Sequence, residues 1–318
     1  MCTSSTKACI LRNAPSWVSS PVEIHHVVLS FLSVTQLVSL GKTSRYNYAL
    51  VKEHIRARVV DLLSQWSLPN SFSEFMNTHN IVFSGSAVLA LLEPECVTPN
   101  DLDAYVPLGA LEDVHTFLSQ HTFYVKFNNL RVGLPDAAVG YISDSSADTG
   151  INDVIYYRHS KTNAVLNIIE TAQAVPTTAI FKFHSTFVMN YLTSNALVCA
   201  YPKMTADHVG LVNTPSPNLT FRTVRCLVKY GVRGFNALDR SYDWKNQVHN
   251  CHSFPYCGRC RRVVGDRFTL CIAFSAGIGA VPNVIDPKLS WTLSSRYDCN
   301  PLKRVAPEKG SVSPGCLY

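Results

Sequence analysis

The chain has 318 residues, of which 47% are hydrophobic and 16% are charged, so it can bury a core of ordinary size. This composition excludes a largely disordered chain. The formal net charge of +6 is modest for this length and permits an acidic partner without requiring one.

Neither a secretory signal nor a membrane span is predicted. Residues 1–15 are polar, and the longest apolar stretch, 271–285, is too short and too interrupted by serine, glycine and proline to cross a bilayer. The 11 cysteines are scattered along the chain, which favours reduced thiols over a disulfide framework. We therefore expect a soluble protein of the cytoplasm or nucleus, without a membrane partner.

The N-terminal part is predicted to consist of a loose leader, 1–19, followed by helices over 20–66. Apolar residues recur with helical spacing between 24 and 40, as in two short helices. Pro21 suits the start of the first helix, and residues 33–35 suit the break between the two.

This helical segment resembles an F-box. The matching residues are the Pro21-x-Glu23-Ile24 opening, Leu29-Ser30-Phe31-Leu32, Leu37, Leu40 and the pair Ser44-Arg45. The resemblance implies docking onto a Skp-type adaptor of a cullin ubiquitin ligase, with partner contacts from Pro21, Ile24, Leu29, Leu32 and Leu37. Helices of this pattern also occur in bundles without a partner, so plain packing helices are the alternative.

Two short motifs open the next predicted unit, which covers 67–275. A buried strand is expected before Gly85-Ser86, a helix after it, and a second strand at Asp101-Leu102-Asp103. Because side chains alternate along a strand, the two carboxylates project to the same side. Paired carboxylates favour a bound cation, and their oxygens suit Mg²⁺. A Gly-Ser turn before a helix offers backbone N–H groups to a phosphate.

The combination resembles the nucleotidyltransferase superfamily, whose signature is a Gly-Ser or Gly-Gly turn, a spacer, and Asp-hydrophobic-Asp. The resemblance implies that Gly85 and Ser86 hold a nucleoside triphosphate and that Asp101 and Asp103 are catalytic ligands of Mg²⁺. The spacer of 14 residues is slightly long for the family. A coincidental turn beside a solvated acidic strand is the alternative.

The family's third acidic residue is missing from the expected strand over 164–170, where Asn167 occupies its position. An amide oxygen can bind a metal but adds no negative charge. Glu170 is expected on the opposite face, because it lies three residues further along the strand. An active two-metal centre is therefore in doubt.

Helices and strands continue through the rest of this unit. A helix over 111–118, strands over 123–127 and 154–158, a mobile loop over 133–152 and a helix over 178–192 are expected. Adjacent residues of a helix do not face each other, so His184 beside Ser185 is interpreted as a packed histidine rather than a base.

A basic stripe is predicted on a helix within 219–235. Arg222, Arg225, Lys229 and Arg233 follow steps of three, four and four residues. The first three are candidates for nucleotide binding, although a solvated outer face gives the same pattern. Without interleaved aromatic residues the stripe is not specific for nucleic acid.

The run from the Gly-Ser turn to Phe235 is similar to uncharacterised proteins of mushroom-forming (agaricomycete) fungi. In those proteins an F-box-like start often precedes a nucleotidyltransferase-like domain. The resemblance implies this architecture, and it brings no established activity.

A cysteine-rich loop is predicted over 249–271. Its Cys257-x2-Cys260 pair has a spacing that suits tetrahedral zinc, and Cys251 and Cys271 are candidates for the remaining ligands. His249 and His252 lie nearby. A redox pair and ordinary structural thiols are the alternatives. Residues 276–318 are expected to form a partly irregular tail.

The sequence thus predicts an α+β protein, with F-box-like helices before a nucleotidyltransferase-like α/β domain that has a mixed sheet. Two functions follow from this architecture. In the first, the chain is a ubiquitin-ligase adaptor with a degenerate nucleotidyltransferase fold. In the second, it is an active Mg²⁺-dependent nucleotidyltransferase that uses Asp101 and Asp103.

Overall fold

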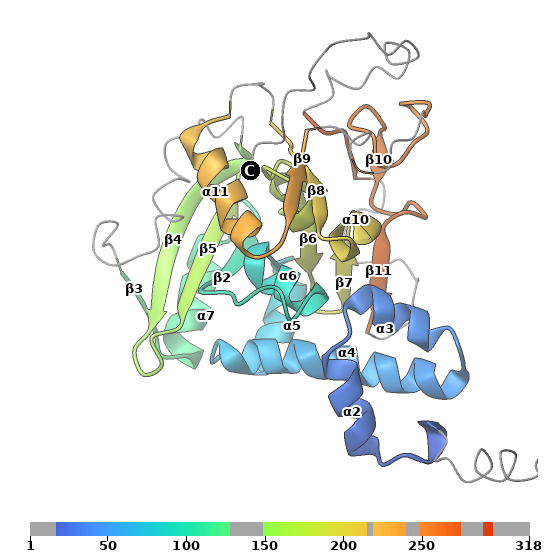
Figure 1. Cartoon of the computed structure of the whole chain (residues 1–318). Coiled ribbons are helices and arrows are strands. Elements are labelled where there is room, and N and C mark those ends of the chain that lie inside the picture. Colours follow the sequence, from blue (N-terminus) through green and yellow to red (C-terminus); the bar gives the residue numbers. More distant parts are fainter. Residues whose placement is uncertain are drawn as a thin grey trace, which may run out of the picture.

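A computed structural model describes residues 17–127, 149–214, 219–239, 244, 249–274 and 289–294. These residues form a mixed α+β structure, in which an N-terminal helical segment lies beside one end of a mixed eight-stranded sheet (Figure 1). The predicted fold class is therefore confirmed. Most of the predicted leader, loop and tail lies outside the described residues.

The helical segment contains η1 (Trp17–Ser19), α2 (Val22–Ser30), α3 (Val34–Gly41) and α4 (Arg45–Gln65), and α5 (Ser71–Thr78) follows it. Its breaks are set by capping residues. The Ser33 hydroxyl accepts a hydrogen bond from the backbone N–H of Gln36, whose side chain in turn accepts from the Ser33 N–H. Ser44 caps α4 by accepting from the N–H of Asn47. The predicted start and break of these helices agree with the structure.

The large sheet has the strand order β11-β7-β6-β1-β2-β5-β4-β3. Its strands β2 and β5 are parallel, and its other neighbours are antiparallel. Two small sheets pair β8 with β9 and β10 with β12. The elements after α5 are β1 (Val82–Ser84), α6 (Gly85–Leu92), β2 (Leu102–Val106), α7 (Leu111–His121), β3 (Tyr124–Lys126), β4 (Ile151–His159), β5 (Val165–Thr171), α9 (Thr177–Ile180), η3 (Thr186–Val188), β6 (Asn190–Leu192), β7 (Ala196–Cys199), α10 (Pro202–Ala206), β8 (Val209–Leu211), α11 (Phe221–Val232), β9 (Asn236–Leu238), β10 (Arg262–Val263), β11 (Leu270–Ala273) and β12 (Ser290–Trp291).

The two faces of the sheet belong to two hydrophobic clusters. Along β2, Leu102, Ala104 and Val106 pack into the first cluster, and Tyr105 packs into the second, as strand alternation predicts. The first cluster also contains Leu29 and other apolar residues of the N-terminal helices. The helical segment and the sheet therefore share one continuous core.

The helix predicted over 178–192 is wrong. The structure places the short helix α9, the 3-10 turn η3 and the strand β6 there. Ile180, Phe187 and Tyr191 are all buried, but they are buried on separate short elements, and a dense apolar run matches helical spacing without being a helix.

His184 and Ser185 consequently do face each other. Ser185 has an extended backbone, and its hydroxyl oxygen lies 2.9 Å from Nδ1 of His184. The expectation that these neighbours point apart depended on the helix and fails with it.

Candidate functional site

Asp103 lies between its two neighbouring strands, each of which brings a predicted site residue to it. In the antiparallel pairing of β1 with β2, Ser84 is opposite Asp103, and Gly85 follows directly. In the parallel pairing of β2 with β5, Asn167 is opposite Asp103. The sheet therefore gathers the Gly-Ser turn, the acidic pair and Asn167 at one place.

The backbone of the turn approaches the carboxylate closely. Gly85 has φ +73°, and a Cβ at this position would overlap Oδ2 of Asp103. Only glycine meets both conditions without strain. Ser86 is buried in the first turn of α6.

Asn167 bridges the two carboxylates. Its amide nitrogen donates to Oδ2 of Asp101 at 3.1 Å and to Oδ1 of Asp103 at 2.8 Å. Its amide oxygen is buried and has no hydrogen-bond partner in the described structure. A half rotation of the amide would turn this oxygen towards the acidic pair, where it would suit a cation that replaces the two hydrogen bonds. The donor set therefore fits Mg²⁺.

The electrostatics of the acidic pair favour a cation. Burial, followed by the negative charge of Asp101, raises the pKa of Asp103 to about 7, while the hydrogen bond from Asn167 and the charge of Lys229 oppose the rise. A carboxylate held in this way is ionised at neutral pH only at a cost in free energy. A bound cation would remove that cost.

Helix α11 presents two of its basic residues to this site. The charge of Lys229 lowers the pKa of Asp103, and the charge of Arg222 lowers that of Tyr156. Burial and the charge of Asp103 have the opposite, larger effect on Tyr156 and raise its pKa to about 12. Figure 1 shows the helix in front of β4 and β5. Arg225 is exposed, and Arg233 donates to the carbonyl of Thr98 at 3.1 Å. The predicted stripe is thus divided, with Arg222 and Lys229 near the acidic pair.

The outer face of α11 is apolar rather than charged. Phe221, Val224, Val228 and Val232 are 78%, 40%, 58% and 86% exposed. Their spacing of three, four and four residues defines a single stripe. Arg222 and Lys229 therefore do not lie on a solvated outer face, which was the alternative interpretation of the basic stripe.

His184 is a packed histidine, as expected, although it does not lie on a helix. Its ring centroid lies 6.0 Å from that of Phe187 and 5.8 Å from that of Tyr230. Burial, followed by the charges of Arg222 and Lys229, lowers its pKa to about 3, so it is neutral at physiological pH. Glu170, as expected, points elsewhere, since its carboxylate accepts from the N–H of Gly109 at 2.7 Å and from the amide of Asn152.

The predicted partner-binding residues divide between core and surface. Leu29 and Leu37 are fully buried, and Leu32 packs against the same core. Pro21 and Ile24 are exposed. Val27 and Val28 on α2 and Phe31 at its C-terminal cap, which were not among the expected partner contacts, are 55%, 40% and 63% exposed.

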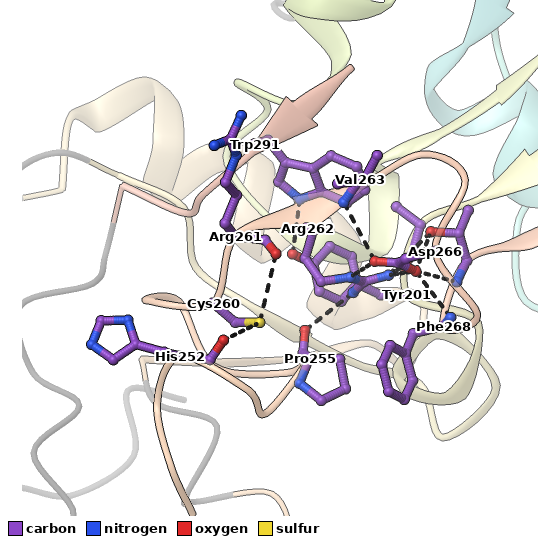
Figure 2. Close-up of polar contacts among 12 residues, drawn as sticks. Tyr201, His252, Pro255, Cys260, Arg261, Arg262, Val263, Asp266, Phe268 and Trp291 are labelled. Carbon is purple, nitrogen blue, oxygen red and sulfur yellow. Dashed lines mark hydrogen bonds and ion pairs between the residues drawn. The ribbon is translucent and has the colours of Figure 1, made fainter. Parts of the chain in front are cut away.

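The cysteine-rich loop brings together three of its four predicted zinc ligands. Cys251, Cys257 and Cys260 form a small buried cluster with Phe254. Cys271 lies on β11 opposite Val198 and packs in the second core cluster instead. Figure 2 shows the fixed end of this loop, where Arg262 contacts Asp266 and the carbonyl of Pro255.

Comparison with known proteins adds no identification. No family model, curated protein or solved structure matches this chain. Among the described residues, no helix combines the length and apolar character needed to cross a membrane. The F-box-like and nucleotidyltransferase-like interpretations therefore rest on the residues and the geometry given above.

Proposed function

We propose that this chain is an F-box-like adaptor, which docks a Skp-type protein of a cullin ubiquitin ligase through α2. One observation carries the proposal. Ile24, Val27, Val28 and Phe31 are 40–63% exposed, and the pairs 24/27, 24/28, 27/31 and 28/31 lie three or four residues apart, so the four form one patch on the side of α2 away from the buried His25 and Leu29. Exposed apolar patches of this kind mark interaction sites. In this proposal the nucleotidyltransferase-like domain serves as a scaffold or as a nucleotide-binding sensor.

We predict that the double substitution Ile24→Glu/Phe31→Glu weakens binding of a purified Skp-type protein by more than about 100-fold, because central apolar anchors dominate such interfaces. Both side chains are exposed, so the fold is expected to survive. Calorimetric titration measures the affinity. Val60→Glu is the matched control, since Val60 is 55% exposed on α4. Failure of the wild type to bind, or equal binding by the double variant, would contradict the proposal.

A second function is favoured by the acidic site, which supports binding of a nucleoside triphosphate with Mg²⁺. Asp101, Asp103 and the amide oxygen of Asn167 would hold the ion, and Lys229 and Arg222 would meet the phosphates. The ion would neutralise phosphate charge. Asn167 stands in place of a third carboxylate, so the site has one negative charge fewer than a two-metal centre for nucleotidyl transfer. The arrangement therefore favours nucleotide binding over transfer.

We expect Mg²⁺ with a suitable nucleoside triphosphate, at about 100 times its dissociation constant, to add about 2.7 kcal/mol to the free energy of unfolding. The melting temperature should rise by roughly 5–10 °C. Lys229→Met should abolish this shift, whereas Arg225→Met, the exposed residue of the same helix, should preserve it. An unchanged melting temperature with every nucleotide would exclude this second function. Equal losses in the two variants would exclude the assigned role of Lys229.

A further inference from the structure

We infer that the cysteine-rich loop holds a structural zinc ion, with His249, Cys251 and Cys257 as three ligands and Cys260 as the fourth. The observation behind it is geometric. One ligand atom each from His249, Cys251 and Cys257 lies within 4.8 Å of the other two. Ligands of a tetrahedral zinc ion, with Zn–S near 2.3 Å and Zn–N near 2.0 Å, are separated by about 3.3–3.8 Å. A small contraction of the group reaches that geometry.

Cys260 packs in the same cluster but lies outside the group whose ligand atoms are within 4.8 Å of one another, so its thiol would have to turn towards that group to become the fourth ligand. Its backbone N–H donates to the carbonyl of Cys257 at 3.0 Å, which closes the Cys-x2-Cys turn that zinc sites use. Its thiol lies within hydrogen-bond distance of two carbonyl oxygens, 3.3 Å from that of His252 and 3.8 Å from that of Arg261. A zinc ion would replace these two weak hydrogen bonds by a thiolate bond.

The structure also selects among the other candidate ligands. His252 contributes its carbonyl to the contact with Cys260, and Figure 2 shows its imidazole directed away from the sulfur. His249, by contrast, is half-buried and stacks on Phe254, with ring centroids 4.4 Å apart. Cys271 is held in the sheet by β11. The ligand set therefore takes His249 in the place that the sequence pattern gave to Cys271.

The loop has no regular secondary structure of its own. Residues 249–261 contain neither helix nor strand, and most of their backbone hydrogen bonds close single turns, as from Phe254 to Asn250. Two longer-range bonds hold it to its surroundings, from the N–H of Leu293 to the carbonyl of Gly258 and from Arg262 to the carbonyl of Pro255. Three thiols and one phenylalanine make a core too small to fix a segment of this length. Small segments of this kind commonly depend on a metal ion for their conformation.

The charge balance suits the ion. Zinc with three thiolates and one imidazole has a net charge of −1, and the loop carries the cations Arg259 and Arg261 beside its cysteines. Binding of zinc would release the protons of the thiols to solvent.

The test uses the full-length protein, purified after growth with added zinc and dialysed against metal-free buffer. Elemental analysis should find one zinc ion per chain, and replacement by Co²⁺ should give the visible absorption of tetrahedral thiolate coordination. His249→Ala, Cys251→Ser, Cys257→Ser and Cys260→Ser should each lose the ion or bind it at least 10-fold more weakly. Cys96→Ser and Cys271→Ser are the matched controls and should keep one ion.

Several results would overturn the inference. These are a wild type that binds neither zinc nor Co²⁺, a Cys251→Ser or Cys257→Ser variant that keeps the ion at full affinity, and a Cys271→Ser variant that folds but loses it. Circular dichroism of each variant separates loss of the ion from loss of the fold. If a cysteine variant does not fold, the wild type is instead treated with a chelator that removes its zinc. The chelated protein should then become sensitive to proteolysis within 249–261, and an unchanged cleavage pattern would contradict a structural role.

Discussion

Replacement of Arg262 by methionine should lower the free energy of unfolding by about 3–5 kcal/mol, the usual cost of removing one partner from a buried ion pair. The Arg262 side chain is only 1% exposed. Its guanidinium donates to Oδ1 of Asp266, to the carbonyls of Ala200 and Pro255, and to Thr269, all at 3.0–3.1 Å. Methionine fills the space but leaves these acceptors without their donor.

Aromatic rings add to the cost. The guanidinium carbon lies 4.9 Å from the ring centroid of Tyr201 and 5.3 Å from that of Trp291, within cation–π range. Figure 2 shows Arg262 enclosed by these rings and its hydrogen-bond acceptors. One side chain thereby ties the cysteine-rich loop to the sheet and to β12.

Chemical denaturation measures this effect, with Arg261→Met as the control. Arg261 is the exposed neighbour, and its guanidinium contacts the hydroxyl of Ser290. Its loss should cost less than about 0.5 kcal/mol. Comparable losses in the two variants would contradict the assigned role of Arg262.

The difference between wild type and Arg262→Met should also depend on pH. Burial alone would raise the pKa of Asp266, but the hydrogen bonds and charge of Arg262 hold it below its usual 3.8. A carboxylate with a lowered pKa in the folded state stabilises the protein at pH values above its unfolded pKa. The difference should therefore be complete at pH 7 and decrease as the pH falls below 3.8.

The second large effect is a gain, rather than a loss, in the free energy of unfolding. Asp103→Asn should raise the free energy of unfolding of the metal-free protein by up to about 4 kcal/mol at pH 8, which raises the melting temperature by roughly 4–8 °C. Burial and Asp101 place the pKa of Asp103 near 7 in the folded state, against 3.8 as its ordinary value. The folded wild type therefore loses stability as the pH rises from about 4 to 7, since its carboxyl must ionise in an unfavourable place. Asparagine does not ionise.

Melting curves at pH 5 and pH 8 in the presence of a chelator check this prediction. The gain should be full at pH 8 and roughly a third to a half as large at pH 5, because a carboxyl with the ordinary pKa of 3.8 is already ionised there in the unfolded chain. Asp61→Asn, an exposed carboxylate on α4, should change neither curve. A loss of stability in Asp103→Asn at pH 8 would show that the carboxylate is structural, whereas a gain would identify it as a group kept at the expense of stability.

The sequence predicted the elements whose signals are local. The break expected at 33–35 and the common side of Asp101 and Asp103 agree with the structure, in which Asn167 donates to both carboxylates. The meeting of Asn167 with these carboxylates was also correctly placed, because the parallel pairing of β2 with β5 fixes the register.

Other features depend on tertiary contacts that no local pattern contains. Spacing places four basic residues of α11 on one stripe, but it does not show which side of the helix faces the protein. The apolar residues of 178–192 are buried on three separate short elements, so their helical spacing gives no reliable element. The burial of Arg262 depends on Ala200 and Trp291, which lie far away in the chain.

The continuous core that joins the N-terminal helices to the sheet has a consequence for cooperativity. Leu37 and Val51 belong to the same cluster as Phe83 and Leu102, so the helical segment and the strands that carry the acidic pair are expected to unfold in one transition. Whatever stabilises one end of this cluster also protects the other end from local opening. A ligand at the acidic pair would thereby prolong the lifetime of the surface that α2 presents, without any change in the shape of that surface.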